Sequence, residues 1–270
     1  MDIAVLGGLA VSAHGKSVTP TAPKPRQVLA LLALHVDQVV SVEALIEELW
    51  GARPPRTART TLQTYVLQLR ELMGAALATA DGPAREAKDV LVTSPGGYLL
   101  VGGDGSCDVR DFELLAGRGY RAADAEDYQG ASRLLRQALD LWTGDAFADV
   151  RTGARLEVAV KRLDESRLCA LDQRIEVDLR LGRHRELLSE LTVLVNRYRT
   201  HENLHAQFML ALYRSGRRSE ALNVYQQLRA RLVRDLGLEP SSYLQRLQRS
   251  LLMAGTDTAT HQDMAPVLSA

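Results

Sequence analysis

Residues 57–73, TARTTLQTYVLQLRELM, carry hydrogen-bonding side chains where a solvated helix usually carries Glu and Lys. The apolar residues recur at the i, i+4, i+7 and i+11 spacing of one helix face; they are Leu62, Val66, Leu69 and Met73. The opposite side holds hydroxyls, amides and one leucine: Thr60, Gln63, Thr64 and Leu67, flanked by Gln68 and Arg70. Hydroxyls and amides can hydrogen-bond to nucleic-acid bases and phosphates, whereas Glu or Asp would be repelled by phosphate. The pattern alone is also typical of an ordinary amphipathic helix.

Positive charge is concentrated around this segment. Residues 50–74 hold four arginines against the single acid Glu71, a local charge of +3, whereas residues 1–105 carry 9 basic and 10 acidic side chains. The four arginines are Arg53, Arg56, Arg59 and Arg70. Because the whole chain has a net charge of zero, a polyanionic partner would have to be recognised by such a local concentration of charge.

The sequence has no spacing typical of a catalytic or cofactor site. It contains no GxxxxGK[ST] phosphate loop, no GxSxG elbow and no GxGxxG after a strand. His201 and His205 stand at i and i+4 and could share a metal ion, but no third ligand is evident, so two solvated or capping histidines are favoured. We therefore expect no enzymatic activity, no metal and no cofactor.

The cysteines and the apolar runs indicate the compartment. Cys107 and Cys169 lack Cys or His partners at ligand spacing, which argues against a disulfide framework and a zinc site. The longest apolar stretch, residues 28–36, is interrupted by His35 and is far shorter than the roughly 20 residues that span a bilayer. The first residues lack the basic region of a signal peptide. These features predict a soluble, cytoplasmic protein without membrane contact.

The first hundred residues predict a mixture of strands and helices. Residues 1–18 alternate short β-rich runs with glycines, which predicts two or three antiparallel strands. A helix is expected from Pro25, a residue suited to a first helical turn. A second helix is expected over residues 41–51, with Ser41 as its N-cap and Gly51 at its end.

After this helix comes a Pro-bearing loop, ARPPR, then the helix over residues 57–73 and a hairpin made of DVLVT, SPGG and YLLVGG. Two amphipathic helices joined by a short loop and followed by a β-hairpin have the order of a winged helix-turn-helix. In that arrangement residues 57–73 would be the recognition helix, whose polar outer face would lie in a DNA major groove.

The second half of the chain is predicted to be helical throughout. Segments beginning at Leu181 and Ser215 align with Gly182 over Gly216 and Leu188 over Leu222. The offset of 34 residues is the tetratricopeptide period. Stacked helix pairs of this kind usually bind protein on a concave face, and the alternative is a helical bundle without a partner.

Five segments together resemble the Streptomyces antibiotic regulatory protein (SARP) family: KPRQVLALLALH, VVSVEALIEELWG, PPRTARTTLQTYVLQLRELMG, SPGGYLL and ALYRSGRRSEALNVYQQLRARLVRDLGLEPS. The resemblance implies a mainly α chain with an α+β N-terminal part. Its expected domains are an OmpR/PhoB-type winged helix over residues 1–104, a bacterial transcriptional activation domain of tetratricopeptide-like helices over 105–253, and a disordered tail over 254–270.

The resemblance also implies an activator of secondary-metabolite, mostly antibiotic, gene clusters. Such a protein would bind direct repeats of double-stranded DNA near the promoter −35 region as a head-to-tail pair, and would contact the RNA polymerase holoenzyme including its sigma factor. It would work in the cytoplasm, at the nucleoid. The sequence shows no receiver domain of the kind usual in OmpR-type regulators, so we expect no phosphorylation control through an aspartate relay.

The match to OmpR-type recognition helices suggests two sets of DNA contacts. The base-reading set is Thr60, Gln63, Thr64, Leu67 and Gln68. The phosphate-contacting set is Trp50, Arg56, Arg59, Thr61, Tyr65, Arg70 and Tyr98. Leu67 would either meet a thymine methyl or be merely tolerated. The turn SPGG has no basic residue for the minor groove, so one subunit should bind modestly and pairing should add avidity.

Two further questions stay open at the level of sequence. Glu43, Glu47 and Glu48 are expected to be solvated, with a basic partner such as polymerase as the alternative. The competing function is a signalling scaffold that binds protein through its tetratricopeptide-like face. A scaffold would not need the Arg, Thr and Gln residues on the outer face of residues 57–70.

Overall fold

The computed structural model describes residues 1–78 and 86–253, and the chain divides into two compact units. The first unit comprises Met1–Tyr120 and Arg133–Ala170. The second comprises Arg121–Ser132 and the chain from Leu171 onward. Residue 104, where the first domain is expected to end, lies within the first unit. The expected tail, 254–270, lies outside the described residues.

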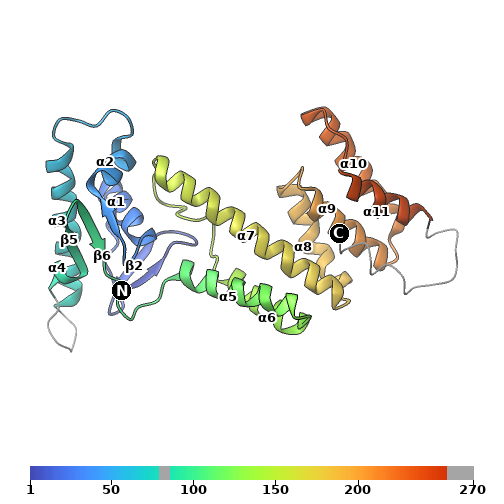
Figure 1. Ribbon diagram of the computed structural model, residues 1–270, viewed down its shortest axis with the longest axis horizontal. Helices are drawn as coiled ribbons and strands as arrows, with labels where there is room; N and C mark the ends of the chain where they lie inside the picture. The colour runs from blue at the N-terminus through green and yellow to red at the C-terminus, as the bar shows by residue number, and fades with distance from the viewer. Residues whose placement is uncertain (79–85, 254–270) are drawn as a thin grey trace. The chain divides into compact units, whose positions relative to one another are not determined.

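Two small antiparallel sheets belong to the first unit (Figure 1). The first has the order β1-β2-β3 and consists of β1 (Asp2–Ala4), β2 (Ala10–Ala13) and β3 (Lys16–Ser17). The second has the order β4-β6-β5 and consists of β4 (Val39–Ser41), β5 (Leu91–Ser94) and β6 (Gly97–Leu100). The predicted N-terminal strands and hairpin are confirmed.

Strand β4 was not expected from the sequence. It pairs with β6 in a register that sets Val40 opposite Tyr98. A Cβ on Gly97 would lie 2.2 Å from the carbonyl oxygen of Val40. Only a residue without a side chain allows β4 to approach this closely, so the glycine of the hairpin turn serves the sheet as well as the turn.

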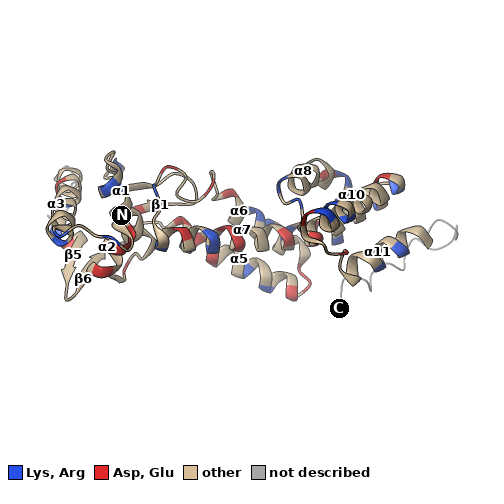
Figure 2. Cartoon of the chain, turned by 90° about the horizontal axis from the view of Figure 1, so that it is seen from above, with Lys and Arg blue, Asp and Glu red and all other residues tan. Residues whose placement is uncertain are grey.

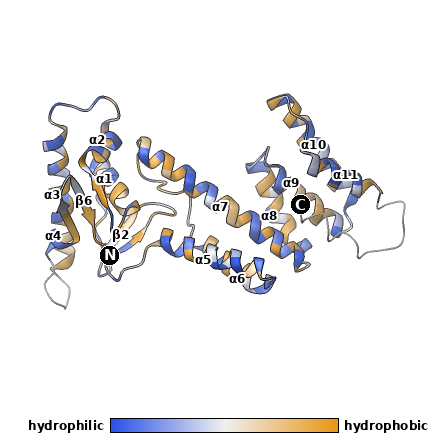
Figure 3. Cartoon of the chain, viewed as in Figure 1, coloured by the Kyte–Doolittle hydropathy of each residue, from blue (hydrophilic) through white to orange (hydrophobic). Residues whose placement is uncertain are grey.

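The helices of the winged helix are α1 (Pro23–Leu34), α2 (Val42–Trp50), α3 (Ala58–Leu77) and the short α4 (Ala87–Val90). Ser41 caps α2 as predicted, because its Oγ accepts a hydrogen bond from the backbone N–H of Ala44 at 3.1 Å. The apolar face of α3 is buried in the core of the unit; its residues are Leu62, Val66, Leu69 and Met73. Figure 3 shows hydrophobic and hydrophilic residues alternating along α3.

Residues 108–253 are mainly helical, as predicted. Their helices are α5 (Asp108–Asp124), α6 (Tyr128–Asp140), α7 (Ala154–Arg180), α8 (His184–Arg197), α9 (Glu202–Arg214), α10 (Arg218–Leu236) and α11 (Ser242–Met253). Gly182 and Gly216, aligned in the predicted repeat, have φ of +78° and +81°. Each occupies the left-handed turn that leads into a helix, α8 or α10, which explains why both positions hold glycine.

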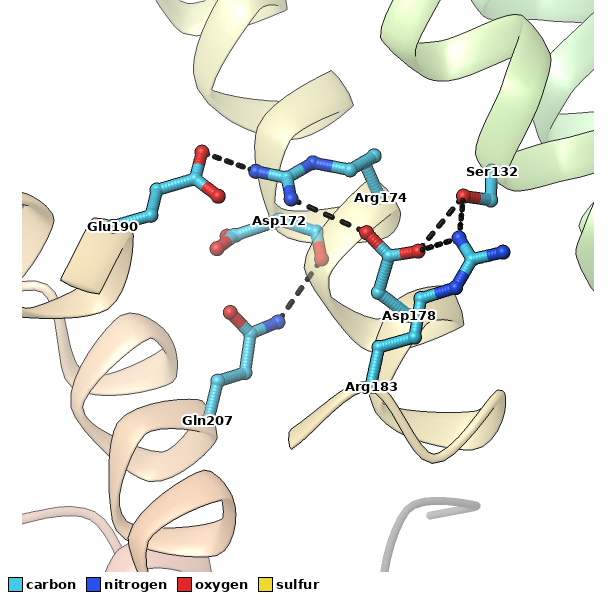
Figure 4. Close-up of polar contacts among 7 residues, drawn as sticks. All are labelled: Ser132, Asp172, Arg174, Asp178, Arg183, Glu190 and Gln207. Atoms are coloured by element: carbon cyan, nitrogen blue, oxygen red, sulfur yellow. Dashed lines mark hydrogen bonds and ion pairs between the residues drawn. The ribbon is translucent and has the colours of Figure 1, made fainter. Parts of the chain in front are cut away.

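A buried ionic network connects three helices of the second unit (Figure 4). The carboxylate of Asp178 accepts hydrogen bonds from Ser132 Oγ at 2.7 Å, from Arg183 at 2.8 Å and from Arg174 at 3.2 Å. Arg174 also pairs with Glu190. The network therefore joins α6, α7 and α8, and each buried charge in it has partners of opposite sign or polar character.

The expectation of two solvated or capping histidines is confirmed for His201, which caps α9, and is wrong for His205, which is buried. His201 Nδ1 accepts a hydrogen bond from the backbone N–H of Leu204 at 3.3 Å, at the start of α9. His205 Nδ1 lies 2.9 Å from the carbonyl oxygen of His201. Within residues 1–78 and 86–253, no cluster of three or more His, Cys, Asp or Glu side chains could hold a metal ion. Nor do these residues form a helix that could cross a bilayer.

Candidate nucleic-acid interface

The outer face of α3 presents the predicted base-reading residues to solvent. All five are exposed, and Leu67 retains 56% of its surface; the set is Thr60, Gln63, Thr64, Leu67 and Gln68. The hydroxyl of Thr64 donates to the carbonyl oxygen of Thr60 at 3.2 Å, which leaves its oxygen free to accept from a partner. The opposite face of α3 is buried in the core, so the exposed face has a fixed orientation within the unit.

The start of α3 suits a negatively charged partner. Its first turn contains no acidic residue, and the partial positive charge of a helix N-terminus favours phosphate. Arg56 lies in the preceding loop, is exposed, and forms no ion pair within the described part of the chain. Most of α3 is drawn in tan in Figure 2, neither acidic nor basic.

Arg59 pairs with a carboxylate of the neighbouring helix. Its guanidinium lies 2.6 Å from Glu43 Oε1, and the two side chains are 70% and 66% exposed. Exposed pairs of this kind contribute about 0–1 kcal/mol, so a phosphate could replace Glu43 at little cost. Glu43 therefore lowers the net positive charge of this surface, which the count of arginines alone did not reveal.

A cluster of aromatic and basic side chains lies at the end of α2. Trp50 and Tyr65, both half-buried, stack with ring centroids 6.5 Å apart, and Thr61 is half-buried on the same helix as Tyr65. The ammonium of Lys24 lies 6.0 Å from the Trp50 ring centroid and donates to the carbonyl oxygen of Leu49.

Lys24 is a candidate contact that sequence reasoning missed. Burial lowers the pKa of Lys24, and Arg151 lowers it further, against the attraction of Glu48. Its position beside Trp50 depends on the folding of α1 against α2, two helices whose mutual placement no local pattern predicts. The only local indication of this contact in the sequence is the basic side chain of Lys24 itself, in the segment PKPR.

Arg70 and Tyr98 hold the hairpin rather than face solvent. The guanidinium of Arg70 donates to the carbonyl oxygen of Leu91 at 2.7 and 3.0 Å and to Thr93 Oγ1 at 2.8 Å. Tyr98 is 8% exposed and belongs to the core. These contacts give Arg70 a positioning role between α3 and β5, and they leave little of Tyr98 for a phosphate.

The three glutamates of α2 have different environments. Glu47 pairs with Arg155 at 2.7 Å near the surface. Glu48 is buried, contrary to the expectation of a solvated side chain. Its carboxylate accepts hydrogen bonds from the backbone N–H groups of Gly153, of Arg155 at 3.0 Å and of Leu156 at 3.1 Å.

Glu48 thereby caps the N-terminus of α7. Gln27 Nε2 donates to the same carboxylate at 3.0 Å, which ties α1 to the junction. A Cβ on Gly153 would lie 2.1 Å from the carbonyl oxygen of Glu48, so the chain comes this close only because that residue is glycine. Within the first unit, these hydrogen bonds join α2 to the start of α7.

Comparison with known proteins gives the same architecture. Residues 15–98 match the family model described as "Transcriptional regulatory protein, C terminal", and residues 107–252 match the "Bacterial transcriptional activator domain". The chain is 54% identical to regulatory protein DnrI of Streptomyces peucetius over 94% of this chain and 93% of that protein.

Longer relatives share the same two domains over part of their length. The chain is 37% identical to regulatory protein AfsR of Streptomyces coelicolor, over 93% of this chain and 24% of that protein. A structure of Mycobacterium tuberculosis EmbR in complex with a low-affinity phosphopeptide matches 94% of this chain and 65% of that chain, with a TM-score of 0.85 and 33% identity. The relatives compared are regulators and not enzymes.

Proposed function

Because the chain belongs to the Streptomyces antibiotic regulatory protein family of transcriptional regulators, we propose that it is a sequence-specific DNA-binding activator. The observation that carries the proposal is the exposed, nearly acid-free outer face of α3. In the major groove, Gln68 and Gln63 would hydrogen-bond to base edges, and Leu67 would contact a thymine methyl. Arg56 and Arg59 would contact phosphates.

The proposed target is a pair of direct repeats near the promoter −35 region of a secondary-metabolite gene cluster. Two copies would bind head to tail, and their linkage on DNA would raise the affinity of modest single sites. Residues 1–104 would select the DNA, while residues 105–253 would support pairing and contact the RNA polymerase holoenzyme with its sigma factor. The protein would act in the cytoplasm, at the nucleoid.

A footprint across promoters of neighbouring genes, at two salt concentrations, tests the proposal. We expect protection of tandem repeats just upstream of −35, and loss of that protection in a Thr64→Ala/Gln68→Ala variant. Gln226→Ala, an exposed glutamine on α10, is the matched control and should protect like wild type. Uniform weak binding that disappears with modest salt would contradict sequence-specific recognition.

The second candidate is a protein-binding scaffold. It is favoured by exposed apolar side chains around the end of α10, at Val233, Leu236 and Leu238, because exposed apolar groups are typical of protein contacts. A scaffold predicts that the Thr64→Ala/Gln68→Ala variant keeps full biological activity, whereas the activator hypothesis predicts that it loses activity.

A further inference from the structure

A cavity of about 800 Å³ lies within the first unit. Its walls come from the end of α1 and the residues after it, from Glu47 of α2, from α5 with the preceding Cys107, and from the first turns of α7. Small-molecule sites commonly occupy about 300–1,000 Å³ at the meeting of structural elements. Neither the DNA-facing surface of α3 nor the contacts inferred above use this cavity.

Apolar side chains form about half of the cavity wall, and polar or charged side chains form the rest. Leu34, Val36 and Val109 contribute side chains from α1, the following segment and α5. Val158 contributes from α7 and is 68% exposed, although it lines the cavity. A branched apolar side chain left so exposed beside a concave wall provides surface that a bound molecule would remove from water.

Three arginines surround this apolar wall, each with a carboxylate partner. Arg110 pairs with Asp37 at 3.1 Å, Arg155 with Glu47 at 2.7 Å and Arg162 with Glu113 at 3.1 Å. All six side chains are about half exposed, between 44% and 56%. Pairs of this kind are worth about 0–1 kcal/mol, so an incoming anion can take the place of a carboxylate.

The wall offers an incoming acidic group guanidinium donors in place of a net positive charge. The three guanidinium groups that line the cavity are matched by three carboxylates, those of Asp37, Glu47 and Glu113, and each pair is open to solvent. Burial lowers the pKa of His35, and Arg155 and Arg162 lower it further, whereas a hydrogen bond with Gln38 raises it, so this half-buried imidazole is neutral near pH 7. Guanidinium planes also stack on aromatic rings and bind acidic groups through two hydrogen bonds.

We propose that this cavity binds a planar, largely apolar small molecule that carries one acidic group, such as a carboxylate, sulfonate or phenolate. The rings lie against Val158 and Val109, and the acidic group replaces a carboxylate at Arg155 or Arg162. The proposal is independent of DNA binding, because it rests on the cavity alone.

The probe for the test is 8-anilinonaphthalene-1-sulfonate, an aromatic anion that fluoresces in apolar sites. Its neutral counterpart is N-phenyl-1-naphthylamine, which has the same rings without the sulfonate. In titrations of the full chain we expect saturable binding of the anion and about tenfold weaker binding of the neutral analogue, the factor expected from one charge-assisted contact.

Val158→Asp should weaken binding of the anionic probe by about tenfold or more, because it removes apolar surface and adds a like charge. The matched control is Val193→Asp on α8, where the valine is 65% exposed and lies outside the cavity; it should bind like wild type. Arg162→Gln provides a second variant at a half-exposed position, with an expected weakening of about fivefold.

Circular dichroism and the melting temperature of each variant establish that it is folded. Wild-type affinity in both Val158→Asp and Arg162→Gln would overturn the location of the site. Equal affinities of the two probes for the wild-type chain would overturn the requirement for an acidic group.

Discussion

The outer face of α3 and the junction between α2 and α7 are both built from polar side chains, but only the junction buries them. On α3, Gln63 and Gln68 are exposed and can exchange water for another partner. At the junction, Glu48 already accepts four hydrogen bonds from protein donors, which are Gly153, Arg155, Leu156 and Gln27. The first surface is suited to recognition, and the second to holding that surface in place.

The same contrast exists within α2 alone. Glu43 and Glu48 lie on one short helix, yet Glu43 is exposed and pairs with Arg59, whereas Glu48 is buried. A carboxylate can be buried when backbone N–H groups at a helix start replace its water. Polar composition therefore does not distinguish a recognition surface from a structural junction, but the identity of the hydrogen-bond donors does.

Replacing Glu48 should produce the largest effect. In Glu48→Ala three backbone N–H groups at the start of α7 lose their acceptor, and we expect the free energy of unfolding to fall by about 3–5 kcal/mol. Urea unfolding followed by circular dichroism measures the change. Glu47→Ala is the matched control, because Glu47 also pairs with Arg155 but near the surface, and its loss should cost less than about 1 kcal/mol. Equal costs for the two variants would contradict the capping role of Glu48.

Local patterns predicted the elements but not the junction. The spacing of Leu62, Val66 and Leu69 identified the buried face of α3, and Ser41 identified the start of α2, because both signals act within about two helical turns. Glu48 and Gly153 are 105 residues apart in the chain. Their contact depends on the packing of two helices, and nothing in the sequence near either residue encodes it.

For the same reason, the sequence predicted the exposure of the base-reading residues in the candidate site but not the roles of Arg70 and Tyr98. The five expected base-reading residues are all exposed, because exposure follows from helical periodicity. The roles of Arg70 and Tyr98 depend on how α3 meets the hairpin, and there the structure shows internal contacts. Their assignment as phosphate contacts stays a prediction. For Arg70, an alanine variant can distinguish a DNA contact from a positioning role.

Arg70→Ala should reduce stability as well as any DNA affinity. The guanidinium makes three hydrogen bonds to β5, and we expect the free energy of unfolding to fall by about 1.5–3 kcal/mol, the range for hydrogen bonds to charged groups. Parallel urea unfolding of Arg59→Ala, which loses only an exposed pair, should show almost no change. An Arg70→Ala variant as stable as wild type would contradict the positioning role, and loss of DNA affinity in that stable variant would assign the side chain to DNA contact.

Gln68→Ala should leave stability unchanged and weaken binding to the specific site. A glutamine that bonds one base edge discriminates by about 1–3 kcal/mol, so the ratio of specific to non-specific affinity should fall by the corresponding factor. Fluorescence anisotropy with a repeat-containing duplex and a scrambled duplex measures this ratio. Equal losses on the two duplexes would show that Gln68 contacts the backbone and does not read sequence.

Arg59→Ala should have the smallest effect, and one of a different kind. A phosphate contact carries no sequence information, so affinity should fall by a similar factor on both duplexes, and the slope of log affinity against log salt should decrease by about 1. The matched control is Arg217→Ala at the N-cap of α10, which removes another exposed, ion-paired arginine and should leave the slope unchanged. An unchanged salt slope in Arg59→Ala would mean that Arg59 of the wild-type chain stays paired with Glu43 when DNA is bound. The outer face of α3 would then bind DNA without a phosphate contact from Arg59.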